Sequence, residues 1–114
     1  MVAYTREEEH GAVTYEVTIR LKGRVTDVGM TPEGRIVVEE ERIARSDLPP
    51  EVAKALAMSP HARGQVKRVE RIVEGENTIA PRFEILIKDG GAFFELTFDR
   101  TGALVKQERT RDAD

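Results

Sequence analysis

Few side chains in this sequence could do chemistry. The chain has 114 residues, no cysteine and two histidines, His10 and His61, which lie far apart. A zinc site needs three or four ligands at close spacing. The two serines, Ser46 and Ser59, lie in no motif that pairs a nucleophile with a histidine. We therefore expect a non-enzymatic protein with no catalytic residue, no metal and no cofactor. We expect His61 to be an exposed loop histidine.

Carboxylates are abundant, with glutamate runs at positions 7–9 and 39–41. Successive residues of a strand face opposite sides, so neither run can converge on one calcium ion. No carboxylate lies in an apolar run that would raise its pKa. The two runs predict solvated strand faces.

The net charge of −3 excludes a broad basic field for nucleic acid. A small cationic cluster, Lys67, Arg68 and Arg71, alternates with apolar residues. It predicts an amphipathic edge strand and a weak alternative site for an acidic partner. No apolar run approaches the ~18 residues of a membrane span, so no membrane insertion is expected.

Alternating apolar and polar residues predict eight strands joined by glycine-containing turns. One helix is expected at 48–58, with Val52 and Leu56 on its apolar stripe. Ser46 or Asp47 would cap it, and Ser59 would end it. These elements indicate an α+β fold. The strands are expected at 3–8, 13–21, 24–30, 35–43, 66–74, 81–88, 92–98 and 103–109.

An internal repeat aligns residues 15–43 with 83–111 without a gap, at an offset of 68. Glu16 meets Glu84, and the turn glycines and apolar positions also correspond. The alignment predicts two tandem antiparallel β-meander repeats that form one sheet, with the helix packed on one face. We expect the helix to pack on the second repeat, against Phe83, Ile85, Phe94, Leu96 and Phe98. The 1–114 chain would be one domain: repeat one 1–43, linker plus helix 44–60, repeat two 61–109 and tail 110–114.

Three runs, 34–41, 47–56 and 94–104, carry a family resemblance. They resemble PepSY-like domains, which share the fold of the β-lactamase inhibitor protein. The resemblance implies a non-enzymatic binding, inhibitory or regulatory module that acts through protein–protein contact. It also implies a periplasmic or secreted protein whose export signal lies outside this chain; the protein would be cytoplasmic if Met1 is its true start.

The family unit is a helix followed by a meander, and here the first repeat lacks its helix. Its apolar face would then need a cover, and a homodimer through this face is our expectation. Two further alternatives stay open: a structural or assembly role and a small-ligand carrier, although no small-molecule substrate is indicated. The candidate interface consists of Tyr15, Val17, Ile19, Val28 and Met30.

Overall fold

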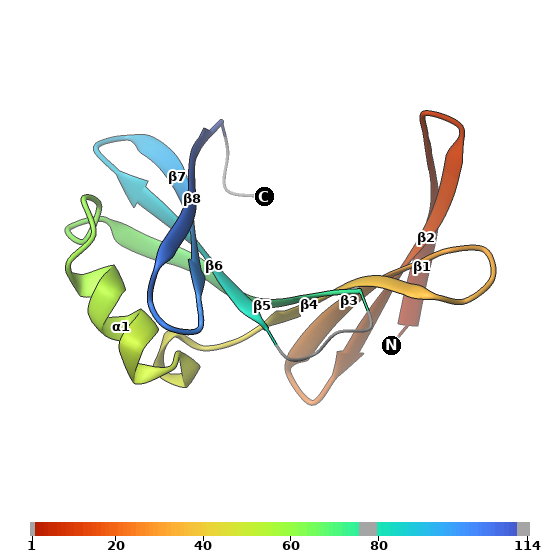
Figure 1. The fold of residues 1–114 in the computed structure, drawn as a ribbon, viewed down its shortest axis with the longest axis horizontal. Coiled ribbons are helices and arrows are strands. Elements are labelled where there is room, and N and C mark those ends of the chain that lie inside the picture. The colour runs from red at the N-terminus through yellow and green to blue at the C-terminus, as the bar shows by residue number, and fades with distance from the viewer. Residues whose placement is uncertain (1, 76–79, 112–114) are drawn as a thin grey trace.

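The computed structural model describes residues 2–75 and 80–111. Within them the chain forms a single antiparallel sheet whose eight strands follow one another in sequence order (Figure 1). A 3₁₀ turn η1 (Arg45–Asp47) and helix α1 (Pro50–Ala57) separate the fourth strand from the fifth. The predicted α+β class is confirmed. The strands are β1 (Val2–Glu9), β2 (Ala12–Leu21), β3 (Arg24–Met30), β4 (Ile36–Arg42), β5 (Gln65–Glu74), β6 (Arg82–Asp89), β7 (Ala92–Asp99) and β8 (Leu104–Thr110).

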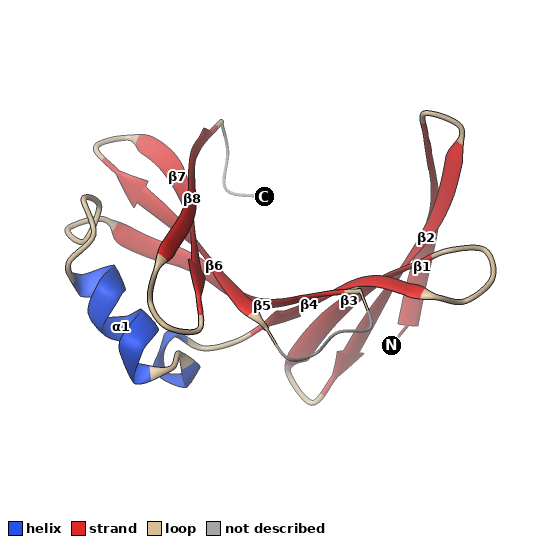
Figure 2. Cartoon of the chain, in the orientation of Figure 1, coloured by secondary structure: helices blue, strands red, loops and turns tan. Residues whose placement is uncertain are grey.

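The sheet curls into a trough, and α1 lies on its outer side (Figures 1 and 2). We call β1–β4 the first half, and β5–β8 with α1 the second half. Helix α1 covers the second half alone, and the first half has no helix on either face among the described residues. No helix of the described residues lies on the inner face of the trough in either half.

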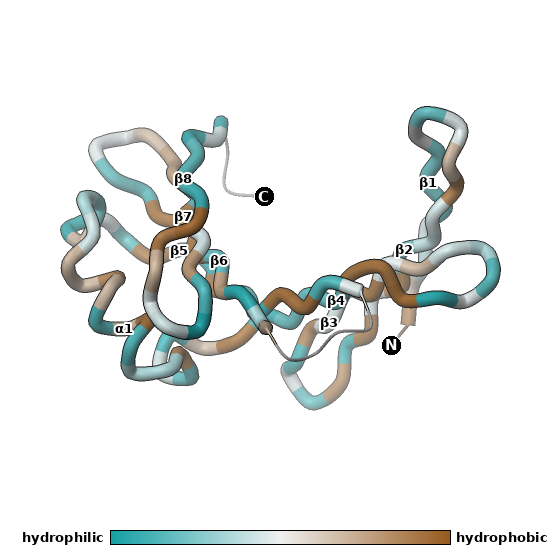
Figure 3. Tube along the Cα trace, viewed as in Figure 1, coloured by the Kyte–Doolittle hydropathy of each residue, from teal (hydrophilic) through white to brown (hydrophobic). Residues whose placement is uncertain are grey.

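The buried core lies entirely in the second half. The expected packing of Val52 and Leu56 on the second meander is confirmed, except that Phe94 lies outside this cluster. Apolar residues nevertheless continue into the first half, for example along β4 (Figure 3). The core cluster consists of Leu48, Val52, Leu56, Val69, Phe83, Ile85, Ile87, Leu96 and Phe98.

The start of α1 differs from the sequence-based expectation. Neither Ser46 nor Asp47 caps the helix, because the N-cap residue is Pro49. Asp47 instead accepts a hydrogen bond from the Ala44 N–H at 3.1 Å within η1. A proline at the first helical position needs no partner for the N–H that it lacks. At the other end, the Ser59 hydroxyl donates to the Leu56 carbonyl at 2.7 Å, where the helix ends.

Strand β5 is central, so the predicted edge strand is wrong. It pairs with β4 on one side and with β6 on the other. Its charges are tolerated there because Arg68 pairs with Glu70, Nε to Oε1 at 3.0 Å. The edges of the sheet are β1 and β8.

The two halves share their strand pairings at the offset of 68. Tyr15 lies opposite Met30, and Phe83 lies opposite Phe98. The ladder shifts register between residues 29 and 30 in one half and between residues 97 and 98 in the other. Turns 31–35 and 99–103 are closed by the same pair of backbone hydrogen bonds, at 2.9–3.0 Å.

Candidate functional site

The inner face of the trough carries a carboxylate on each strand from β2 to β7. Side chains alternate between the faces of a strand, and Phe83 and Ile85 point towards α1. Glu84 therefore faces the trough, opposite Glu70 on β5. We call this set the acidic row: Glu16, Asp27, Glu40, Glu70, Glu84 and Glu95.

Parts of the acidic row are held by neighbouring polar groups. Glu70 is only 7% exposed and forms an ion pair with Arg68. The Thr18 hydroxyl donates to Asp27 Oδ1 at 2.6 Å across β2 and β3. These contacts hold two of the six carboxylates on the sheet, and Arg42 on β4 lies opposite Glu70 on the same face.

Burial and mutual repulsion raise the pKa of three members of the row. The pKa of Glu84 rises to about 7, chiefly because the carboxyl is buried, and secondarily because Glu95, Glu70 and Glu40 lie near it. Burial also raises the pKa of Glu40, and Glu70 adds to the effect. The pKa of Glu16 rises from burial and from the charge of Asp27.

The expectation that no carboxylate has a raised pKa is therefore wrong. The burial of Glu84 comes from the curl of the sheet and from neighbours across strands, neither of which shows in the local sequence. The sequence contained one sign that Glu84 belongs to this site. Glu84 aligns with Glu16 in the internal repeat, and both carboxylates face the trough.

The row has the form of a line and not of a metal cage. Neighbouring strands lie roughly 4.8 Å apart, so one carboxylate per strand spreads the charge along the trough. Among the described residues, no group of three or more His, Cys, Asp or Glu is placed to hold a metal ion. A line of acceptors suits several cationic side chains presented by one surface.

His61 is not the exposed loop histidine that the sequence predicted. Its Nδ1 lies 2.8 Å from Asp89 Oδ2, and its ring stacks on Phe94 with centroids 3.8 Å apart. Its Nε2 lies 3.2 Å from Gln107 Nε2. The nearby Ser59 hydroxyl is engaged with the Leu56 carbonyl. The His61–Asp89 pair therefore anchors the loop after α1 to the β6–β7 hairpin.

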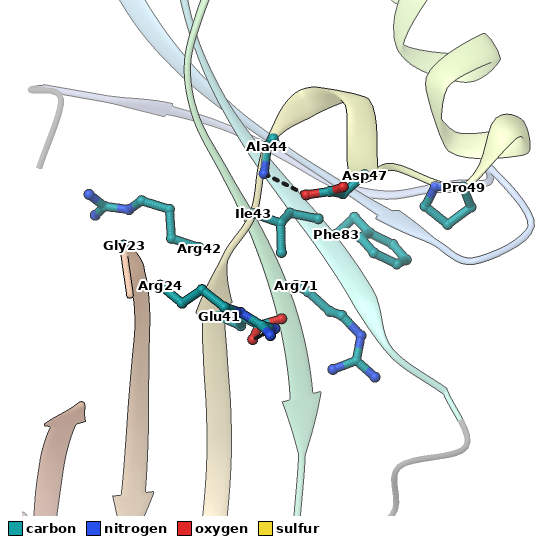
Figure 4. A pocket seen from close by; sticks show the side chains of 10 residues that line it. All are labelled: Gly23, Arg24, Glu41, Arg42, Ile43, Ala44, Asp47, Pro49, Arg71 and Phe83. Atoms are coloured by element: carbon teal, nitrogen blue, oxygen red, sulfur yellow. Dashed lines mark hydrogen bonds and ion pairs between the residues drawn. The ribbon is translucent and has the colours of Figure 1, made fainter. Parts of the chain in front are cut away.

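A cleft of about 750 Å³ lies on the outer side, where the β2–β3 turn, the end of β4 and the start of α1 meet (Figure 4). Arg24 and Glu41 form an ion pair there, and Arg42 points away from them. Arg71 and Phe83, on the neighbouring strands β5 and β6, also line the cleft. This mixed, arginine-rich lining differs from the largely apolar walls typical of small-ligand carriers.

The candidate interface predicted from sequence lies together on the outer face of the first half. Tyr15 pairs with Met30 and Val17 with Val28, and Ile19 shares their face two residues further along β2. Ile19 is 39% exposed, whereas its counterpart Ile87 under the helix is 1% exposed. The structure brings these residues together without showing what covers them, and the homodimer stays a prediction.

No family model and no curated protein matches this chain. Solved structures do. A DUF2874 family protein from Bacteroides uniformis matches with a TM-score of 0.82 and 18% identity, over 95% of this chain and 76% of the other. A BLIP-like protein from Bacteroides fragilis matches with a TM-score of 0.79 and 21% identity, over 98% and 77% of the two chains.

A third structure, from Bacteroides eggerthii, has a provisional description as a periplasmic protein. It has a TM-score of 0.82 and 21% identity, over 95% of this chain and 76% of that one. In the described part of the chain, no helix has the length and apolarity needed to cross a membrane. At these identities the likeness concerns the fold, and the fold of this chain is BLIP-like.

Proposed function

We propose that this protein is a non-enzymatic binding module, inhibitory or regulatory in role, whose trough binds a partner protein through lysine and arginine side chains. The acidic row carries this proposal. Glu84 has a pKa near 7 because it is part-buried beside other carboxylates, on a face that no helix of the described residues covers. A cationic partner would relieve that repulsion and complete the hydrogen bonding of the row.

The similar structures support the same role. One of them is a BLIP-like protein, and this likeness supports a role in protein–protein contact. We further propose that the chain is one PepSY-like domain made of two tandem meander repeats, as the shared registers at offset 68 support. The provisional periplasmic description of one similar structure supports a periplasmic or secreted location.

Binding of a lysine-rich peptide of alternating lysine and alanine tests the trough directly. The double variant Glu40→Gln/Glu84→Gln removes two ionisable carboxyl groups from the row. The matched control Glu33→Gln/Glu51→Gln removes two exposed charges, one on the β3–β4 loop and one on α1. We expect the trough variant to weaken binding about tenfold at low salt, and the control to change it little.

Two further readouts sharpen this test. Binding should weaken as salt rises, because screened charges attract less. Near pH 7, peptide binding should also release protons, since a cation beside Glu84 lowers the raised pKa of that carboxyl. Equal weakening by both double variants would show an attraction to net charge alone and would overturn the proposed site.

A further inference from the structure

Strand β5 is central in the sheet, but β4 covers only part of its length. The pairing of the two strands ends where Arg42 lies opposite Glu70. One further backbone hydrogen bond, from the Ile43 N–H to the Val69 carbonyl at 2.9 Å, follows it. The chain then leaves β4 towards α1 (Figure 1). Residues 65–68 of β5 therefore have β6 on one side and no strand of the described residues on the other. We call this segment the free edge.

The free edge is held firmly from its other side. A Cβ added to Gly64, just before β5, would lie 2.3 Å from Cγ2 of Ile87, so the chain that enters the free edge presses on β6. Val66 packs against the core cluster. Unpaired N–H and C=O groups along a strand edge are a template for another strand. An edge that is already ordered loses little conformational freedom when such a strand joins it.

A groove of about 520 Å³ lies between the free edge and the chain that leaves β4. The charged residues that line it are all cationic: Arg42, Arg45, Lys67 and Arg68. Glu70 offsets part of this charge, because it pairs with Arg68 and lies opposite Arg42. Arg45 and Lys67 are exposed, and neither forms an ion pair within the described residues. The groove therefore presents positive charge beside the free edge.

This charge determines which kind of strand can join. The ladder to β6 shifts register between Val66 and Arg68, so Lys67 lies outside it. A lysine at a strand edge discourages pairing with a second copy of the same edge, because like charges would meet. An extended segment rich in Asp or Glu meets no such repulsion. Its alternate side chains face one side, so carboxylates at every second position gather on one face of the added strand.

We propose that the free edge binds an acidic segment of a partner protein, which adds a short strand to the sheet beside residues 65–68. Its carboxylates lie against Arg45 and Lys67. Main-chain hydrogen bonds supply the affinity, and the cationic groove selects the partner. The site is separate from the acidic row and opposite to it in charge.

A capped hexapeptide of alternating glutamate and valine tests the groove at low salt. The variant Arg45→Glu/Lys67→Glu reverses two charges beside the free edge. The matched control Arg35→Glu/Arg100→Glu reverses two exposed charges in or beside turns elsewhere, with the same change in net charge. We expect the groove variant to weaken binding about tenfold or more, and the control about twofold at most.

The same peptide with every backbone nitrogen methylated tests the added strand, because it keeps the carboxylates and loses the donors. We expect it to bind about tenfold more weakly than the unmethylated peptide. The unmethylated peptide should also slow amide exchange within residues 65–68. The trough variant Glu40→Gln/Glu84→Gln should bind it at least as tightly as the unmodified chain, which separates this site from the acidic row.

Three results would overturn the proposal. These are no binding of the acidic peptide, equal weakening by the two charge-reversal variants, and equal binding of the two peptides. Light scattering on the peptide-free chain tests the other occupant. A dimer in which residues 65–68 are already protected from exchange would assign the free edge to a second copy and overturn the acidic partner.

Discussion

The two halves of this molecule have the same strand pairings and very different burial. Tyr15 and Met30 pair as Phe83 and Phe98 do, and their turns close with the same hydrogen bonds. Yet every buried residue in the described chain lies between Leu48 and Phe98. The difference shows that strand pairing alone does not build a core here. The helix that covers one meander accounts for the burial of the core cluster on its outer face.

The largest expected effect is on the free energy of unfolding, which the loss of an apolar side chain should lower far more in the second half than in the first. Leu56→Ala in α1 should lower the free energy of unfolding by about 2–5 kcal/mol, because Leu56 is buried in the core cluster. Val17→Ala, on the uncovered face, should cost less than about 1 kcal/mol. Chemical denaturation measures both. Similar losses would mean that the first half has a core of its own.

The paired turn glycines give a sharper comparison. Gly34→Ala and Gly102→Ala both place an alanine at a φ near +90°, at a similar backbone cost. Only Gly102→Ala also drives a methyl group into the Glu51 carbonyl. We expect it to cost about 1–3 kcal/mol more than Gly34→Ala in thermal or chemical unfolding. Equal costs would show that α1 does not press on this turn.

The loop after α1 should contribute a smaller stabilisation. His61→Ala removes the contact with Asp89 and the stacking on Phe94, and should cost about 1–2 kcal/mol in chemical denaturation. Met58→Ala, at an exposed position just before the loop, is the control and should change stability by less than about 0.5 kcal/mol. If His61→Ala costs no more stability than Met58→Ala, the His61–Asp89 pair does not anchor the loop.

The smallest effect concerns pH. Glu84 has a raised pKa in the folded protein, so folding favours its protonated form. Its contribution to stability is full below the unfolded pKa of 4.5 and is lost as pH rises through about 7. Glu84→Gln should therefore stabilise the protein by about 1 kcal/mol at pH 8, after allowance for solvent screening, and by nothing below pH 4.

Glu16→Gln, at the corresponding position of the first half, should give a gain of the same sign and smaller size. Glu16 is more exposed than Glu84, and its pKa is also raised by burial and by Asp27. Unfolding curves at pH 4, 6 and 8 measure both gains. A loss of stability at pH 8 in Glu84→Gln would contradict the raised pKa.

Most of the fold follows from the sequence because most strands alternate in polarity and are followed by a turn that contains a glycine. The predicted strand at 24–30 matches β3, and the other strand boundaries agree within one residue. The helix was placed correctly by its stripe of Val52 and Leu56. The cap of the helix was predicted incorrectly, because Pro49 and Pro50 begin the helix without a side-chain cap.

The candidate site was harder to predict because it depends on pairing across strands. Glu40, Glu70 and Glu84 are distant in sequence and meet only through the pairing of β4, β5 and β6. His61 meets Asp89 through a loop whose path no local pattern specifies. Arg68 suggested an edge strand because its partner, Glu70, could not be recognised without the structure.

Residue-resolved amide hydrogen exchange on the unmodified chain tests the central claim most directly. The claim is that β2–β3 and β6–β7 have the same hydrogen-bonded pairing and differ because α1 covers only one of them. We predict that amides of β2 and β3 open at a free energy lower by about 2 kcal/mol or more than those of β6 and β7. Equal protection in the two halves would contradict the account.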